Sequence, residues 1–358
     1  MAYTGTNFAT PKLDGEALRR YTSKNIKENI FQNILALPEK GVTERFSEDV
    51  NASEIRIIRQ VAPNIKARQL GASVNGGYFN SNQAIMPTSQ EYGMKLLFTI
   101  DDQIDFPAVM DDMVELPVAE ATTKNVGGIV ANNINACTIA TQLASVINAK
   151  IDGVATNEVI MSSATAYKDA LLDASGKLDD GDNANGIAIF PVDGRQGFLR
   201  SRARVGLMKS GNILIGGSNY AQEMLSRGVI TPDTYKKENL EYFGELDGVP
   251  MCVVSKQVWD LAEQYLVDST TSSQIDAGKL NSVEAIVVAG IATGRALAFN
   301  HSVKMIDCPR GQGKTAQYCY RWGCEVFSQL GIVPILTNGT TLATISANKL
   351  NVQAPGSI

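Results

Sequence analysis

Two stretches of alternating hydrophobic and polar residues flank a glycine-rich segment between residues 47 and 105. In the first stretch, residues 54–70, aliphatic side chains such as Ile55 and Ile57 fall near a period of two, with basic residues between them. This period is typical of a half-buried strand. The second stretch, residues 91–106, is rich in aromatic and aliphatic residues and predicts a returning strand. The sequence therefore predicts a long two-stranded ribbon.

The tip of this ribbon, residues 71–82, has the glycine and asparagine content of a turn. A two-stranded ribbon that stands away from its own domain does not cover its apolar face, so we expect a partner outside the chain to cover it. The candidate subunit contacts here are Arg56 and Arg59 on the outgoing strand and Tyr78 and Phe79 at the tip. The pattern favours a subunit of an assembly over a free monomer.

Helical periodicity appears on both sides of the ribbon. Residues 15–35 place isoleucine side chains one turn apart and predict a helix that ends before Pro38. The pattern of residues 117–149 predicts a helix of about 45 to 50 Å, at 1.5 Å per residue. Gly127 and Gly128 lie within it, and we expect a bend there.

Beyond residue 157, helical and strand patterns alternate along the chain. A helix is predicted over residues 162–172, a buried strand over residues 187–192 and another strand over residues 248–255. The apolar runs within residues 283–299 continue that sheet, and residues 315–336 predict strands that return to the first domain. The chain is therefore expected to be an α+β protein.

Composition narrows the function classes. With 358 residues, 44% of them hydrophobic, the chain is long enough for a full core in two domains. A net charge of -5 argues against a dedicated nucleic-acid binder, so any contact with DNA is expected to be local. The longest apolar run contains Glu284 and Arg295, which predicts a soluble, cytosolic protein without a membrane partner. Five cysteines fit reduced thiols better than a disulfide framework.

Few residues are suited to catalysis or metal binding. His301 is the only histidine, and we interpret it as a structural or solvated residue. Cys308, Cys319 and Cys324 form no CxxC pair, so a zinc site is not expected. The sequence predicts no catalytic residue and no metal ligand.

Two motif fragments are misleading. The run CPRGQGKT ends like a phosphate-binding loop, but Cys308 stands at the first glycine position and Pro309 removes a backbone N–H that such a loop needs. Residues 180–191 faintly resemble a calcium loop, but Ala184 replaces a ligand and Pro191 stands in place of the bidentate glutamate. We interpret the first as a basic surface turn and the second as an acidic loop, and expect no cofactor.

The order of these parts resembles the major capsid protein of tailed phages, which has the Hong Kong 97-like fold. Local similarity is strongest in the strings IAIFPVDGRQGFLRSR and ELDGVPMCVVS. The resemblance implies an N-terminal arm, an extended ribbon loop, a peripheral domain with a long spine helix, an axial domain and a return to the peripheral domain. These parts correspond to residues 1–46, 47–105, 106–157, 158–310 and 311–358, respectively.

The resemblance also implies a function. Members of the family self-assemble as hexamers and pentamers into an icosahedral shell, which encloses double-stranded DNA and is built in the cytoplasm of the host bacterium. A portal protein, packaged DNA bound without sequence preference, and optional scaffolding or decoration proteins are the implied partners. The tip residues 71–82 contain no lysine, so the covalent cross-link of some members is not carried over. An encapsulin-like shell is the nearest alternative, and an α/β nucleotide-dependent enzyme is a remote one.

A basic stretch, residues 194–206, leaves two interpretations open. Its arginines are either the solvated face of a helix or a set of contacts to other subunits or to the capsid interior. The residues concerned are Arg195, Arg200, Arg202 and Arg204.

Overall fold

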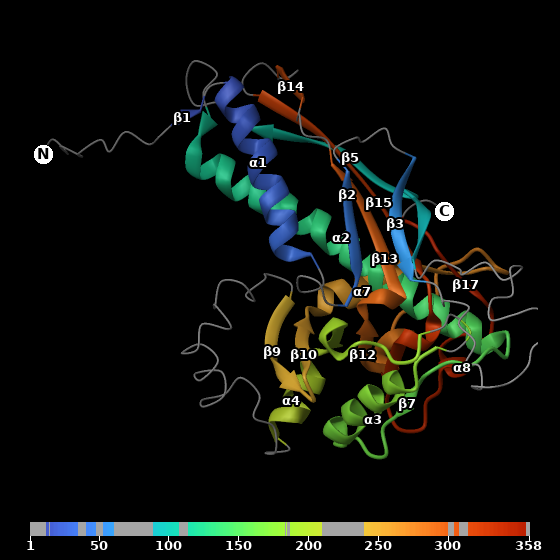
Figure 1. The fold of residues 1–358 in the computed structure, drawn as a ribbon. Helices are drawn as coiled ribbons and strands as arrows, with labels where there is room; N and C mark the ends of the chain where they lie inside the picture. The colour runs from blue at the N-terminus through green and yellow to red at the C-terminus, as the bar shows by residue number, and fades with distance from the viewer. Residues whose placement is uncertain are drawn as a thin grey trace, which may run out of the picture.

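A computed structural model gives the fold of the chain. It describes residues 12–13, 15–34, 41–47, 53–60, 89–106, 114–182, 184, 187–209, 240–299, 304–307 and 314–355. Two sheets of different make-up occupy the upper and lower parts of Figure 1, and one long helix, α2, runs diagonally from the upper part toward the lower one. We call these parts the upper body and the lower body.

Two helices of the upper body lie side by side (Figure 1). Helix α1 spans Gly15–Asn33 and helix α2 spans Leu116–Ile151, so both predicted helices are confirmed to within a few residues. With 36 residues, α2 is about 54 Å long at 1.5 Å per residue. The apolar stripe of α1, which includes Ile26 and Ile30, is fully buried. The N-terminal helix is therefore docked on its own chain.

The helix α2 continues without a break through its two glycines. A Cβ atom on Gly127 would lie 2.5 Å from the Cβ of Asn29 in α1, far inside contact distance. The glycine thus allows α1 and α2 to approach closely, and this packing is the role that the structure gives to Gly127.

A five-stranded sheet forms the rest of the upper body. The strand β15 is central: it pairs with β5 on one side, and on the other with β14 and β13, the latter continuing to β2. All neighbours are antiparallel except β13 and β2, which run parallel. The strands are β2 (Thr43–Ser47), β5 (Phe98–Phe106), β13 (Thr293–Phe299), β14 (Lys304–Asp307) and β15 (Lys314–Val326).

The ribbon is present, but its base belongs to the upper body. Strands β3 (Glu54–Gln60) and β4 (Ser89–Lys95) pair antiparallel. Ile57 and Met94 are buried against Ala296 of β13. This packing corrects the expectation that only an outside partner covers the apolar residues of the ribbon. The strand predicted over residues 91–106 is in fact two strands, because β5 leaves the ribbon and joins β15.

A six-stranded mixed sheet forms the lower body, in the order β7-β16-β12-β8-β10-β9. Helices α3 (Tyr167–Asp179) and α4 (Ser201–Lys209) pack against its strands, whereas α7 (Lys256–Tyr265) packs mainly on α2. The strands are β7 (Val159–Ile160), β8 (Arg195–Leu199), β9 (Leu240–Leu246), β10 (Val249–Val254), β12 (Val283–Ala289) and β16 (Ile332–Leu336).

Several sequence expectations for this body need correction. Residues 187–192 are not a strand; Ile187 forms one isolated bridge, and the buried strand is β8. The expected helix begins only at Tyr167. β13 does not continue the sheet of β12, and β16 returns to it instead of staying with β15. The chain passes from one sheet to the other at two 3-10 turns: Gly290–Ala292 between β12 and β13, and Gln329–Gly331 between β15 and β16. Residue 310 therefore does not mark a change of sheet.

Short elements complete the described chain. β1 (Lys12–Leu13) pairs with β6 (Val114–Glu115), and β11 (Leu266–Asp268) pairs with β17 (Leu350–Val352), which follows α8 (Leu342–Ile345). The side chain of Asn148 in α2 donates to the carbonyl of Leu350 and accepts from its N–H, at 2.8 and 2.7 Å. The C-terminal strand is therefore attached to the long helix.

Candidate functional site

The four arginines of residues 194–206 lie at different depths in the lower body. Arg195, at the start of β8, is 1% exposed, and its guanidinium donates to the carbonyl of Phe190 at 2.6 Å and forms an ion pair with Asp179 at 2.6 Å. It also donates to Ser175. These bonds occupy the guanidinium within the chain, so the solvated-face interpretation is wrong for Arg195.

Arg200 follows β8 directly and is 8% exposed. Its Nε donates to the carbonyl of Val283 at 2.6 Å, and its Nη2 donates to the carbonyl of Leu280 at 2.9 Å. The guanidinium carbon lies 4.4 Å from the ring centre of Trp259, a cation–π distance. The solvated-face interpretation is therefore wrong for Arg200 as well.

Burial lowers the pKa of Arg200 to about 10, and the neighbouring Arg202 contributes in the same direction. The guanidinium is still protonated at neutral pH. Arg202 forms an ion pair with the buried Glu284 at 2.7 Å, but within the described part of the chain no carboxylate forms an ion pair with Arg200. The carboxylates of Glu284, Asp260 and Glu263 act on the Arg200 charge in the opposite direction from beyond ion-pair distance, so the charge is compensated only in part and the position can accommodate an anion.

A pocket of about 210 Å³ opens beside Arg200. Its lining includes Arg202, Lys256, Val254 and Trp259, and we call it the Arg200 pocket. The indole N–H of Trp259 is buried without a hydrogen-bond partner in the described structure. The pocket thus combines cationic groups with an apolar wall.

The fold explains why the pocket is located here. β8 and β10 are parallel neighbours, and at their carboxyl ends the chain continues directly into α4 and α7. The two helices diverge, because α4 packs on the sheet and α7 packs on α2. Such a divergence leaves a crevice at the carboxyl ends of parallel strands. Both helices also begin here, so their positive dipole ends lie nearby, and in α7 the Ser255 hydroxyl already accepts from the N–H of Val258.

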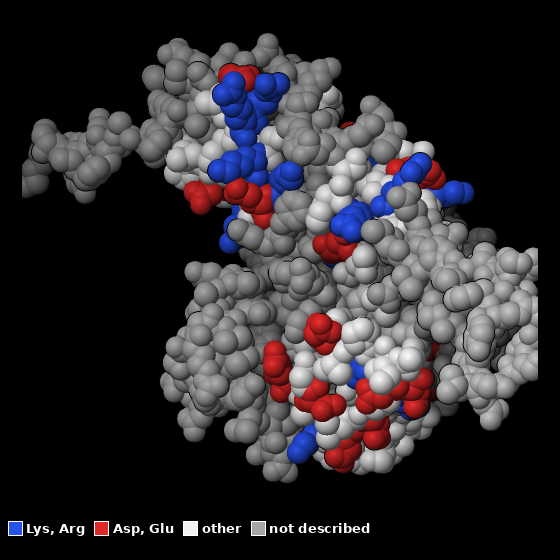
Figure 2. All heavy atoms as spheres, viewed as in Figure 1, with Lys and Arg blue, Asp and Glu red and all other residues white. Residues whose placement is uncertain are grey.

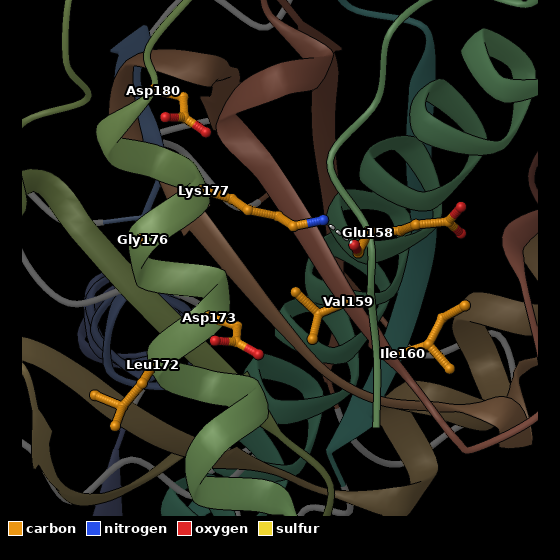
Figure 3. Close-up of a pocket in the computed structure, with 8 residues that line it drawn as sticks. All are labelled: Glu158, Val159, Ile160, Leu172, Asp173, Gly176, Lys177 and Asp180. Atoms are coloured by element: carbon orange, nitrogen blue, oxygen red, sulfur yellow. Dashed lines mark hydrogen bonds between the residues drawn. The ribbon is translucent and has the colours of Figure 1, made fainter. Parts of the chain in front are cut away.

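A second hollow lies between α3 and the edge strand β7, with a volume of about 460 Å³ (Figure 3). Asp173, Lys177 and Asp180 point from α3 toward β7, and the ammonium of Lys177 donates to the carbonyl of Glu158. The apolar side chains of Ile160 and Leu172 are partly exposed at its rim, 42% and 38%. We call this hollow the α3 groove.

Acidic side chains follow one side of α3. Asp169, Asp173 and Asp180 are exposed, at spacings of four and seven residues that place them along one stripe of the helix. Within the described residues they form no ion pair. Figure 2 shows acidic side chains gathered over the lower body, whereas basic ones lie over α1 in the upper body. The α3 groove is therefore part of an acidic surface.

The other candidate contacts are only partly described. Arg56 is exposed on β3, Arg202 is exposed at the Arg200 pocket, and Arg204 is half-buried on α4. Arg59 belongs to β3, but its side chain lies outside the described set, as do Tyr78 and Phe79. As subunit contacts, these residues stay predictions.

The motif fragments receive structural roles where they are described. Asp182 is 2% exposed, and its carboxylate accepts a hydrogen bond from Ser328. Lys314 and Thr315 begin β15, whereas a phosphate-binding loop leads into a helix. His301 and Cys308 lie outside the described residues. None of the four described cysteines, Cys137, Cys252, Cys319 and Cys324, forms a disulfide.

The described parts of the chain contain no group of three side chains suited to holding a metal ion. Among the described helices, none has both the length and the apolar character to cross a membrane.

Comparison with solved structures reveals a shared fold. The capsid of Ralstonia phage GP4 matches with a TM-score of 0.51 and 8% identity, over 87% of this chain and 90% of that one. The capsid of cyanophage P-SCSP1u matches with a TM-score of 0.50 and 12% identity, over 86% of this chain and 90% of that one. The chain has the fold of a phage capsid protein. This confirms the fold that the sequence resemblance implied.

A virus-like particle from Pyrococcus furiosus also matches, with a TM-score of 0.41 and 11% identity, over 89% of this chain and 98% of that one. No family model matches the sequence, and no curated protein matches it. The likeness therefore rests on three-dimensional structure. At sequence identities this low, it shows a shared fold and nothing more.

Sequence reasoning found Arg200 and Arg202 but missed Lys256, Trp259 and the stripe on α3. The spacing of Asp169, Asp173 and Asp180 is a usable signal, because it is helical. No comparable signal marks the Arg200 pocket, since β8 and β10 are brought together only by the sheet.

Proposed function

We propose that this chain is a major capsid protein, which self-assembles into the icosahedral shell around the double-stranded DNA of a tailed phage. The observation that carries this proposal is the capsid fold, shared with phage capsid structures over 86% and 87% of the chain. The described parts correspond to an arm helix, a ribbon, a spine helix, a peripheral body and an axial body.

The packing of the described parts supports a protomer in which the arm helix and the ribbon base are attached to the upper body. The arm helix α1 is docked on the spine helix α2, and the ribbon base is anchored on β13 and β15 through Ile57, Met94 and Gly323. In an assembly, the lower body associates as hexamers and pentamers, while the ribbon tip and the first residues link one capsomer to the next. Each contact is weak alone, and the closed lattice sums many of them.

This function implies further partners. A portal protein, optional scaffolding or decoration proteins and packaged DNA are expected, with assembly in the cytoplasm of the host bacterium. A net charge of -5 is consistent with DNA contacts that are local and independent of sequence.

Particle formation tests the proposal directly. The purified full-length chain is followed by sucrose gradient and by negative-stain microscopy, over a range of protein concentrations. We expect closed shells or capsomer rings; a compact particle of protomer size at every concentration would contradict the function. Small uniform shells that carry protein cargo and no nucleic acid would instead favour the encapsulin-like alternative.

The ribbon tip offers a second test. Replacing residues 71–82 with a short Asn-Gly turn should leave the thermal unfolding of the protomer unchanged, because the base keeps its own packing through Ile57 and Met94. Closed shells should no longer form. A Gly-Ser tip of the same length separates the effect of length from that of side chains such as Tyr78. Normal shells from the shortened variant would refute a linking role for the tip.

The enzyme alternative is tested at Lys314, the lysine of the loop-like run. Lys314→Ala should change neither particle formation nor any nucleotide-binding signal. Lys314 begins a strand, and Pro309 lacks a backbone N–H that a phosphate-binding loop needs. Saturable, magnesium-dependent ATP binding by the wild type that this variant loses would revive the enzyme interpretation.

A further inference from the structure

The lower body presents two hollows of opposite charge. The Arg200 pocket contains a buried guanidinium that donates to carbonyl groups and forms no ion pair in the described structure, although Glu284, Asp260 and Glu263 act on it from a longer distance. Lys256 stands at its rim and is 83% exposed; its one described ion pair, with Asp260, is long at 3.8 Å. Two helices direct their positive ends to the same place. The pocket is therefore suited to an oxyanion.

The α3 groove has the complementary character. Asp173 and Asp180 project from α3, and Asp169 extends the acidic stripe on the exposed side of the helix. Ile160 and Leu172 are exposed beside the groove, and Figure 3 shows their side chains pointing away from it. In the Arg200 pocket the apolar counterpart is the wall formed by Val254 and Trp259. The two hollows are therefore complementary in charge.

We infer that the Arg200 pocket receives a carboxylate from the acidic α3 groove of a second copy of this chain, with Asp173 as the central donor. This inference rests on the proposed shell-forming function and names the contact between neighbouring lower bodies. The contact is heterologous, because it joins two different surfaces. After one contact, one copy keeps an unused groove and the other keeps an unused pocket, so repetition closes into a ring or extends as a chain.

A second copy is favoured over DNA as the source of the oxyanion. The apolar wall of Val254 and Trp259 beside the cations suits a carboxylate on a packed protein surface better than it suits a hydrated phosphate.

Charge reversal on each surface provides the test. Lys256→Glu reverses the pocket rim without burying a charge, and an acid at the first position of a helix is compatible with folding. Asp173→Lys reverses the groove at an exposed position of α3. The controls are Asp276→Lys and Lys279→Glu, which are exposed on the same body and outside both hollows. Circular dichroism and thermal unfolding verify that all variants fold.

Self-association is measured by analytical ultracentrifugation and negative-stain microscopy. Each reversal alone should raise the protein concentration needed for rings by about tenfold or more, because like charges then face each other. The double variant Asp173→Lys/Lys256→Glu should recover rings. An equimolar mixture of the two single variants should also recover even-numbered rings, since every contact in an alternating ring is again attractive.

The outcomes separate this inference from the proposed function. A wild type that never self-associates overturns both. Wild-type rings that persist in both single variants, or are weakened equally by the controls, overturn the contact and leave the capsid function standing. Binding of a short double-stranded DNA that Lys256→Glu abolishes while ring formation is unchanged would also overturn it, and would assign the pocket to phosphate.

Discussion

The buried ion pair between Arg295 and Glu44 should decide whether β2 stays attached to the upper body. Arg295 lies on β13 and is fully buried, and Glu44 stands beside it on the parallel edge strand β2. The guanidinium also donates to the hydroxyl of Thr138 in α2 at 3.1 Å. Glu44→Gln removes the carboxylate and leaves the buried guanidinium in place.

The magnitude follows from this geometry. Burial lowers the pKa of Arg295 only to about 10, so the guanidinium is charged at neutral pH and needs its carboxylate. Removing one partner of a buried pair costs about 3 to 5 kcal/mol. Because the side chain of Glu44 is 20% exposed, Arg295→Met leaves a carboxylate that water still reaches, and we expect a smaller loss. The double variant should lose less free energy of unfolding than the two single variants lose together, because the two residues form one coupled pair.

Urea unfolding of unassembled protomers measures these free energies. The emission of Trp322 is a suitable probe, because this tryptophan is buried in β15 and stacks on Phe98 at 5.8 Å. Phe98 lies on β5, so the signal reports on the five-stranded sheet. A loss below about 0.5 kcal/mol for Glu44→Gln, the size of an ordinary surface substitution, would refute the reasoning.

Two further predictions concern α2. Gly127→Ala should destabilise the protomer by about 1 to 3 kcal/mol, because the new methyl group forces α1 away at Asn29. Gly176→Ala is the control, since open space surrounds this helical position. It should be neutral or slightly stabilising in the same unfolding assay. Burial raises the pKa of the Cys137 thiol above its ordinary value of 9.0. Above about pH 9 the unfolded chain therefore loses a proton that the folded chain retains, and stability should fall by up to about 1.4 kcal/mol per pH unit from this group. Between pH 8 and pH 10, the free energy of unfolding in urea should fall less for Cys137→Ala than for the wild type. An equal fall in both proteins would contradict a raised pKa at Cys137.

The sequence alone determined the elements whose signal is local. The helices α1 and α2 were predicted because a hydrophobic stripe with a 3.6-residue period is repeated over many turns, and such repetition is hard to produce by chance. β10 was predicted because residues 248–255 form a short apolar run. The order of parts was then sufficient to suggest the capsid fold.

Only the tertiary structure decided what depends on pairing between distant segments. The apolar run at residues 187–192 looked like a strand, yet the strand is β8, whose Arg195 is stabilised in the core by Asp179 and the carbonyl of Phe190. β13 and β16 each lie in a different sheet from the one predicted. The sequence did not distinguish the two sheets, because a buried strand is apolar whichever strands it pairs with. The Arg200 pocket exists because β8 and β10, about fifty residues apart, lie side by side and send their helices in different directions. Local patterns determine which segments become helices and strands, whereas the placement of charged groups against one another depends on long-range packing that no local pattern encodes.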